Sequence, residues 1–118
     1  MNTSFDYLYR DGSNYKQWGS IVFEGDISDD LRSRFARALE STEFSIADQI
    51  RMPEVFPDSW PIYADDHCWH AFSDFEPTAE PPNDRFSRAI EQFVLEVECA
   101  SSDGWRDFDP QERPRRVT

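Results

Sequence analysis

The chain has 118 residues, of which 24 are acidic and 12 are basic, so its formal net charge is −12. This length fits one domain, and ten Phe, four Tyr and four Trp supply the large apolar side chains of a core that needs no disulfide or metal. A charge this negative repels nucleic acid and anionic membranes, so we expect neither as a direct ligand. It favours a basic protein as partner.

The sequence shows neither a signal peptide nor a membrane span. The first residues lack the basic and apolar regions of a secretory leader, and no apolar run approaches the ~20 residues that a spanning helix needs. The two cysteines, Cys68 and Cys99, are far apart and outside any CxxC motif. We therefore expect a cytoplasmic protein with reduced thiols.

The first half of the chain predicts two strands and a helix. Residues 5–10 alternate aromatic and polar side chains, and residues 20–24 are apolar and β-branched, so both read as strands, with residues 15–19 as part of their connection. Ser28 is a suitable N-cap, and two acidic residues follow it. The helix that follows has an apolar stripe formed by Leu31, Phe35, Ala38 and Leu39.

The second half predicts two further strands and a second helix. Residues 43–50 and 68–76 are expected strands, separated by a proline-rich ordered loop. Asn83 or Asp84 is the expected cap of a helix that ends at residues 101–104. Its apolar positions are Phe86, Ile90, Phe93, Val94 and Val97, with Cys99 as a further core residue and Trp105 folding back onto the core.

This order, β-β-α-β-β-α, predicts an α+β fold. We expect a two-layer sandwich in which about four mostly antiparallel strands form one small sheet, with both helices on one of its faces. The predicted acidic domain covers residues 1–109. Residues 110–118 are rich in arginine and are expected to form a flexible tail.

One short stretch concentrates residues with metal-binding and nucleophilic potential. His67, Cys68 and His70 follow Asp65 and Asp66, and zinc accepts nitrogen, sulfur and oxygen ligands. On a strand, however, His67 and His70 would point to opposite faces, and no glycine-rich loop or nucleophile elbow accompanies Cys68. We therefore predict no catalytic residue, no metal and no cofactor, and keep a metal- or thiol-dependent enzyme as an alternative.

The acidic residues suggest a different kind of site. Residues 48–109 contain 15 acidic and 4 basic residues, and a rigid array of carboxylates can replace phosphates in a groove lined with Lys and Arg. Trp60 and Tyr63 are the expected aromatic anchors, because interface hot spots favour Trp and Tyr. The candidate carboxylates are Asp58, Asp65, Asp66, Glu80, Asp84, Glu91 and Glu98. We expect Arg32, Arg34 and Arg37 to pair with local acids.

Three segments resemble a recurring family of small acidic bacterial proteins. They are Phe5-Asp6-Tyr7-Leu8-Tyr9-Arg10-Asp11, Asn14-Tyr15-Lys16-Gln17-Trp18-Gly19 and Asp66-His67-Cys68-Trp69-His70-Ala71-Phe72, with a closing Gly104-Trp105. The resemblance implies no catalytic residues. In size and acidity the chain is also similar to phage anti-CRISPR and DNA-mimic inhibitors, and to immunity proteins that neutralise nuclease toxins.

These observations favour a non-enzymatic inhibitor. The leading hypothesis is an acidic protein that binds and blocks a basic, nucleic-acid-handling protein. The alternatives are an immunity protein or antitoxin for one toxin, and an enzyme centred on His67, Cys68 and His70.

Overall fold

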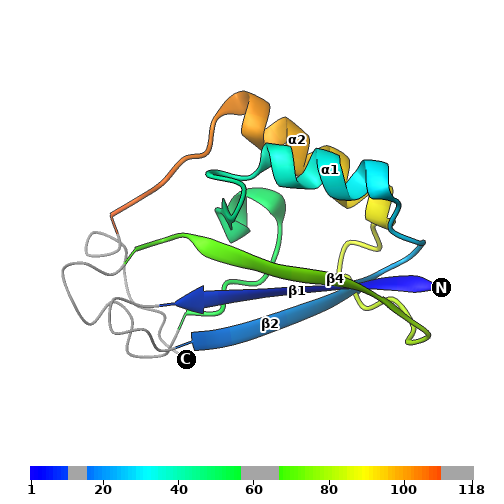
Figure 1. Ribbon diagram of the computed structural model, residues 1–118. Helices are drawn as coiled ribbons and strands as arrows, with labels where there is room; N and C mark the ends of the chain where they lie inside the picture. The colour runs from blue at the N-terminus through cyan, green and yellow to red at the C-terminus, as the bar shows by residue number, and fades with distance from the viewer. Residues whose placement is uncertain (11–15, 57–66, 110–118) are drawn as a thin grey trace.

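The computed structural model describes residues 1–10, 16–56 and 67–109. Their elements are β1 (Asn2–Arg10), β2 (Lys16–Phe23), α1 (Asp29–Ala38), β3 (Phe44–Ser45), the 3-10 helix η1 (Ala47–Ile50), β4 (His70–Thr78) and α2 (Ile90–Asp103). The strands form one antiparallel sheet in the order β2-β1-β4-β3. Figure 1 shows α1 and α2 side by side over one face of this sheet. The predicted α+β sandwich is confirmed.

Aromatic residues fill the space between the two layers. The Phe5 ring of β1 lies 5.2 Å from Phe75 of β4, 5.5 Å from Phe35 of α1 and 5.1 Å from Phe93 of α2, measured between ring centroids. All four side chains are at most 2 % exposed. Because aromatic pairs add to the free energy gained from area burial, this cluster fixes both helices on the central strand.

The first helix forms as the sequence predicts. The Ser28 side chain accepts a hydrogen bond from the backbone N–H of Leu31, which satisfies one of the free donors at the helix start. The predicted apolar stripe of Leu31, Phe35, Ala38 and Leu39 is buried. Near the other end of the described chain, Trp105 packs against the core, as expected. Its Nε1–H donates to the Ala38 carbonyl.

The second strand begins four residues earlier than predicted. Residues 16–19 pair with β1, and the pairing runs from Arg10↔Lys16 to Thr3↔Phe23 without a register shift. Gly19 interrupts the alternation of apolar and polar side chains by which a strand is recognised in the sequence, because glycine has no side chain. A Cβ atom at Gly19 would lie 2.5 Å from Cζ of Tyr7, so the tyrosine ring occupies the space where a side chain would be.

Residues 43–50 do not form one strand, contrary to the prediction. Only Phe44 and Ser45 pair with β4, and Ala47–Ile50 form the 3-10 helix η1. Ile46, Ala47 and Ile50 are buried, so the apolar residues of this segment join the core without forming a strand. β4 starts at His70 rather than residue 68, and continues through Pro77 to Thr78.

The second helix also differs at its start. It begins at Ile90 after Ala89, and the Gln92 side chain accepts the Ala89 backbone N–H. Neither Asn83 nor Asp84 caps it, and Phe86 lies in the preceding turn with 44 % of its side chain exposed. Cys99 is exposed rather than part of the core. The buried side of α2 is taken by Phe93, Val94, Val97 and Ala100.

Two predicted segments fall outside the described residues. They are the greater part of the proline-rich loop, residues 57–66, and the Arg-rich tail, residues 110–118. Within the described ranges, no helix combines the length and apolar character needed to cross a bilayer.

Candidate acidic interaction site

Six exposed carboxylates gather at one end of the molecule. Figure 1 shows that the N-terminus, the starts of both helices and the segment between β4 and α2 all lie at this end. We call it the acidic end and define it by Glu24, Asp26, Asp29, Asp30, Glu80 and Glu91, all of which are exposed.

Backbone contacts hold these carboxylates in place. The Glu24 carbonyl accepts the N–H of Ile90, which places Glu24 beside the start of α2 and Glu91. Asn2 joins the remaining parts: its side chain donates to the Glu80 carbonyl and accepts the N–H of Gly25. The acidic end is therefore held together by β1 and by the start of α2.

Few basic groups offset this charge. The N-terminal amine lies 3.0 Å from the Asp26 carboxylate, and Arg34 lies 3.7 Å from Asp30. Among the described residues, Glu24, Asp29, Glu80 and Glu91 have no basic group within ion-pair distance. The result is a concentrated negative potential, which can steer a basic partner.

Helix stability accounts for half of the cluster. Asp29 and Asp30 lie in the first turn of α1, and Glu91 lies in the first turn of α2. A carboxylate there interacts favourably with the helix dipole by roughly 0.3–1 kcal/mol. Glu24, Asp26 and Glu80 lie outside both first turns. These three carboxylates have no such role, and they are the part of the site that the helix starts do not explain.

Asp84 is not part of an open acidic surface, contrary to expectation. Its side chain is 2 % exposed and accepts two hydrogen bonds of 3.0 Å from the guanidinium of Arg88. Arg88 also donates to the carbonyls of Ile50 and Arg51, and it is bonded to Glu96. Burial alone would raise the pKa of Asp84, but the bonds from Arg88 outweigh it and hold the pKa below its usual range.

Glu98 is likewise unavailable as a free carboxylate. Arg34 donates to both of its oxygens, with the shortest N···O distance at 2.6 Å. This bond lowers the pKa of Glu98 and raises that of Arg34. Arg32 lies 3.7 Å from Asp74, so two of the three α1 arginines pair with nearby acids, as expected.

Of the predicted site, the structure brings Glu80 and Glu91 to the acidic end and separates Asp84 and Glu98 from it. Asp58, Trp60, Tyr63, Asp65 and Asp66 lie outside the described residues. Sequence reasoning missed Glu24, Asp26, Asp29 and Asp30 as partner-binding candidates, because the charge excess of the second half pointed away from them.

The His67 side chain has a structural role. Its Nδ1 accepts the N–H of Trp69 at 3.1 Å, so its Nε2 carries the proton and donates to the Arg10 carbonyl at 2.7 Å. Both ring nitrogens are therefore engaged within the fold. His67 precedes β4 and ties it to the end of β1.

His70 and Cys68 are buried, each with its own contacts. His70 Nε2 accepts the N–H of Val55 at 3.0 Å, and burial lowers the pKa of this imidazole to about 4, so the ring is neutral near pH 7. Cys68 is 2 % exposed, and its Sγ accepts the N–H of Phe108. Nowhere in ranges 1–10, 16–56 and 67–109 do three His, Cys, Asp or Glu side chains form a group that could hold a metal ion.

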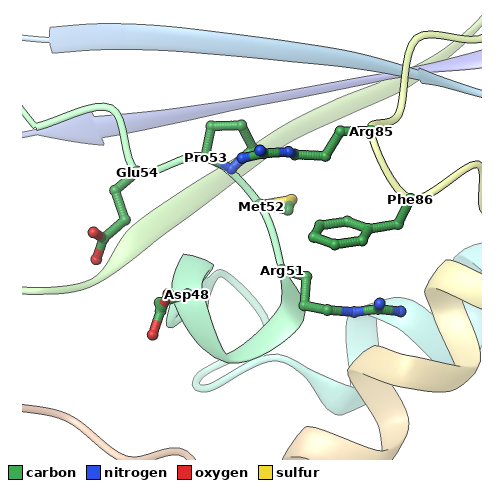
Figure 2. A pocket seen from close by; sticks show the side chains of 7 residues that line it. All are labelled: Asp48, Arg51, Met52, Pro53, Glu54, Arg85 and Phe86. Atoms are coloured by element: carbon green, nitrogen blue, oxygen red, sulfur yellow. The ribbon is translucent and has the colours of Figure 1, made fainter.

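A small pocket lies beside Arg88, Asp84 and Glu96, which we call the Arg88 cluster. Figure 2 shows the Phe86 ring between the side chains of Arg85 and Arg51, with Asp48 and Glu54 across the pocket. Its volume is about 220 Å³, and the Arg51 guanidinium carbon lies 4.5 Å from the Phe86 centroid. The described residues that line it are Asp48, Arg51, Met52, Pro53, Glu54, Arg85 and Phe86.

Searches for similarity with protein-family models, curated proteins and solved structures found no match to this chain. The resemblance drawn from the sequence segments therefore stays a prediction.

Proposed function

We propose that the protein is an acidic interaction protein that binds and blocks a basic, nucleic-acid-handling protein through its acidic end. The observation that carries this proposal is the exposure of Glu24 and Glu80 without an ion pair among the described residues, beside four further carboxylates. A groove that binds nucleic acid is lined with Lys and Arg, and fixed carboxylates can occupy the places of phosphates there.

The distribution of charge supports a binding role over solubility alone. Like charges held close together repel one another, and an even distribution would lower that repulsion at the same net charge. Three carboxylates offset part of this cost at the helix starts. Asp26 is offset by the N-terminal amine, whereas Glu24 and Glu80 have neither a helix start nor an ion pair among the described residues. A basic partner therefore supplies the better explanation for the position of these two carboxylates.

A cognate toxin is the second candidate of the same class. An immunity protein would use the same surface on a single basic toxin, and the two functions differ in how many proteins are bound. The side chains of His67, Cys68 and His70 each bond to a different part of the backbone, which gives no support to an enzyme centred on them.

The test is recovery of partners from a lysate of the native host with three forms of the tagged protein. The first is wild type. The second carries Glu24→Lys and Glu80→Lys, and the third is a matched control with Glu40→Lys and Asp103→Lys, both outside the acidic end. Both variants have a net charge of −8, because each replaces two acids by two bases. Recovered proteins are identified by mass spectrometry, and DNA duplex is added as competitor.

We expect a basic nucleic-acid-binding protein that wild type and the control retain at low salt. The Glu24/Glu80 variant should lose it, and DNA duplex should displace it. Recovery that is equal for all three forms, or a partner that DNA does not displace, would contradict the proposal. Absence of any specific partner at low salt would contradict it as well.

A further inference from the structure

Over part of its length, the outer edge of β2 pairs with no other described segment of the chain. Because β2 pairs with β1 without a register shift, alternate residues direct their N–H and C=O groups away from β1. Val22 is one of them: its N–H donates to the Asn83 side chain, and its carbonyl accepts the Asn83 N–H. By the same alternation, Lys16, Trp18 and Ser20 point their backbone groups outward. None of these three residues has a backbone partner at this edge within the described part of the chain.

The side chains along this open edge are exposed. Trp18 is 60 % exposed, and Lys16 and Ser20 are exposed on either side of it. Lys16, the only lysine of the chain, has no ion pair with the described residues. An exposed strand edge with a large apolar side chain is a template for pairing with another strand.

Asp6 completes the pattern on the neighbouring strand. It is paired with Ser20 across β1 and β2, and its carboxylate accepts a 2.8 Å hydrogen bond from the Ser20 hydroxyl. No basic group of the described chain lies within ion-pair distance of Asp6, and Asp74, another acid, is its neighbour on β4. Like charges placed opposite each other destabilise a sheet, so a cation near Asp6 and Asp74 would be stabilising. A partner that pairs with this edge could supply that cation.

We propose that a second copy of this chain docks on this edge, with its β2 antiparallel to the first and the two-fold axis at Trp18. This register places Trp18 opposite Trp18 of the other copy, and Lys16 of each copy opposite Ser20 of the other. Antiparallel pairing around a two-fold axis uses the same edge on both subunits, so every exchanged hydrogen bond occurs twice.

Charge complementarity favours a second copy in this register. Lys16 of one copy lies two strands away from Asp6 of the other, a backbone distance of roughly 10 Å that a lysine and an aspartate can bridge with their side chains. The edge thus carries its own complement: a cation two residues before Trp18, and a carboxylate beside the residue two positions after it.

The opposite edge of the sheet, formed by β4 and β3, is partly covered by other segments of the chain. β3 pairs with β4 at His70 and Ala71, the Phe72 N–H donates to the Glu43 carbonyl, and the Arg32 guanidinium donates to the Phe75 carbonyl. Asn83 closes β2 at Val22 in a comparable way. Among the described residues, these positions are closed, whereas residues 16–20 form an exposed stretch of edge without a backbone partner.

The first test is the concentration dependence of mass, measured by analytical ultracentrifugation at about 150 mM salt, the physiological range. The paired segment is short and the net charge opposes association, so we expect a weak dimer with a dissociation constant on the order of 100 µM. Trp18→Glu should weaken it roughly tenfold or more by placing two carboxylates on the axis. Gln17→Glu is the matched control, because it adds the same charge next to Trp18 on the other face of the strand.

A charge swap tests the register. Lys16→Glu should weaken the dimer, and adding Asp6→Lys should restore it while returning the net charge to −12. Hydrogen exchange supplies an independent readout, since the amides of Lys16, Trp18 and Ser20 should become protected as the concentration rises. Circular dichroism shows that each variant is folded.

Three results would overturn the proposal. One is a monomer at about 1 mM, roughly ten times the expected dissociation constant, with no concentration-dependent protection at residues 16–20. Another is a dimer that Trp18→Glu leaves intact, which would place the contact elsewhere. The third is equal weakening by Trp18→Glu and Gln17→Glu, which would make the effect one of net charge alone.

Discussion

Carboxylates of the acidic end and carboxylates bound by Arg88 lie close together along the chain but in opposite environments. Glu80 is exposed, whereas the side chain of Asp84, four residues later, is 2 % exposed and binds Arg88. Glu91 is exposed at the start of α2, whereas Glu96 on the same helix bonds to Arg88 and Arg51. Acidic residues only four or five positions apart therefore serve either the fold or the surface, and their partners decide which.

The two regions should respond differently to substitution. A charge in the interior must keep its partners, because removal of one leaves the other desolvated and unpaired. A charge at the surface keeps its water, and most exposed ion pairs contribute about 0–1 kcal/mol. Stability should therefore depend on the Arg88 cluster, while the acidic end can vary without loss of the fold.

Arg88→Ala should produce the largest effect. It leaves the buried Asp84 carboxylate without its cation and leaves the Ile50 and Arg51 carbonyls without their donor. Breaking a buried ion pair in this way costs about 3–5 kcal/mol, so we expect the free energy of unfolding in urea to fall by that amount.

Arg85→Ala is the control for this prediction. Arg85 is exposed and makes no ion pair with the described residues, so its loss should change the free energy of unfolding by less than about 0.5 kcal/mol. Similar losses for Arg85→Ala and Arg88→Ala would show that the two regions do not differ as described.

His70 is a buried imidazole that stays neutral in the folded protein at neutral pH. Burial holds its pKa at about 4 in the folded protein, whereas a solvated histidine of the unfolded chain has a pKa of 6.5. Between these values the unfolded chain binds a proton that the folded protein does not, so stability falls as the pH is lowered from 6.5 towards 4. The slope is about 1.4 kcal/mol per pH unit, and the full loss is about 3 kcal/mol.

His70→Gln should remove this pH dependence. The amide oxygen of glutamine can still accept the Val55 N–H, but glutamine does not titrate. The difference in the free energy of unfolding between about pH 7 and about pH 5 should shrink by about 2 kcal/mol relative to wild type. Chemical denaturation at both pH values measures it. An unchanged difference would show that His70 titrates alike in both states.

The fold was predictable where the sequence carries a regular period. The apolar stripe of α1 and the alternation of β1 identify those elements because one side of each is buried. The extension of β2 back to Lys16 was not visible, since Gly19 fits beneath a ring from the neighbouring strand. The predicted start of α2 was wrong because Asn83 and Asp84, although both are residue types that cap helices, bond to β2 and to Arg88 instead.

The acidic site was harder to predict than the fold. Composition shows an excess of carboxylates but not which of them lie side by side. Asp84 and Glu98 were expected at the surface of the site. Only the fold brings Arg34 to Glu98, 64 residues away, whereas Arg88 lies four residues after Asp84, a spacing that the sequence already shows. Glu24 and Glu91 are distant in sequence, and it is the Glu24–Ile90 backbone bond that makes them neighbours.

The smallest effect on stability should come from the acidic end. In the Glu24→Lys/Glu80→Lys variant, both changes are at exposed positions outside the first turns of the helices. We expect the free energy of unfolding to stay within about 0.5 kcal/mol of wild type at about 150 mM salt. At low salt it should rise slightly, because the substitutions relieve repulsion that salt otherwise screens.

Urea denaturation at two salt concentrations tests this expectation, with Asp84→Asn as the contrasting variant. Asp84→Asn removes the buried carboxylate that faces Arg88, so its loss of stability should be large at both salt concentrations. If the Glu24/Glu80 variant lost as much stability as Asp84→Asn, the acidic end would be part of the structural framework. Failure of the Glu24/Glu80 variant to recover a partner would then reflect loss of the fold and not loss of a binding surface.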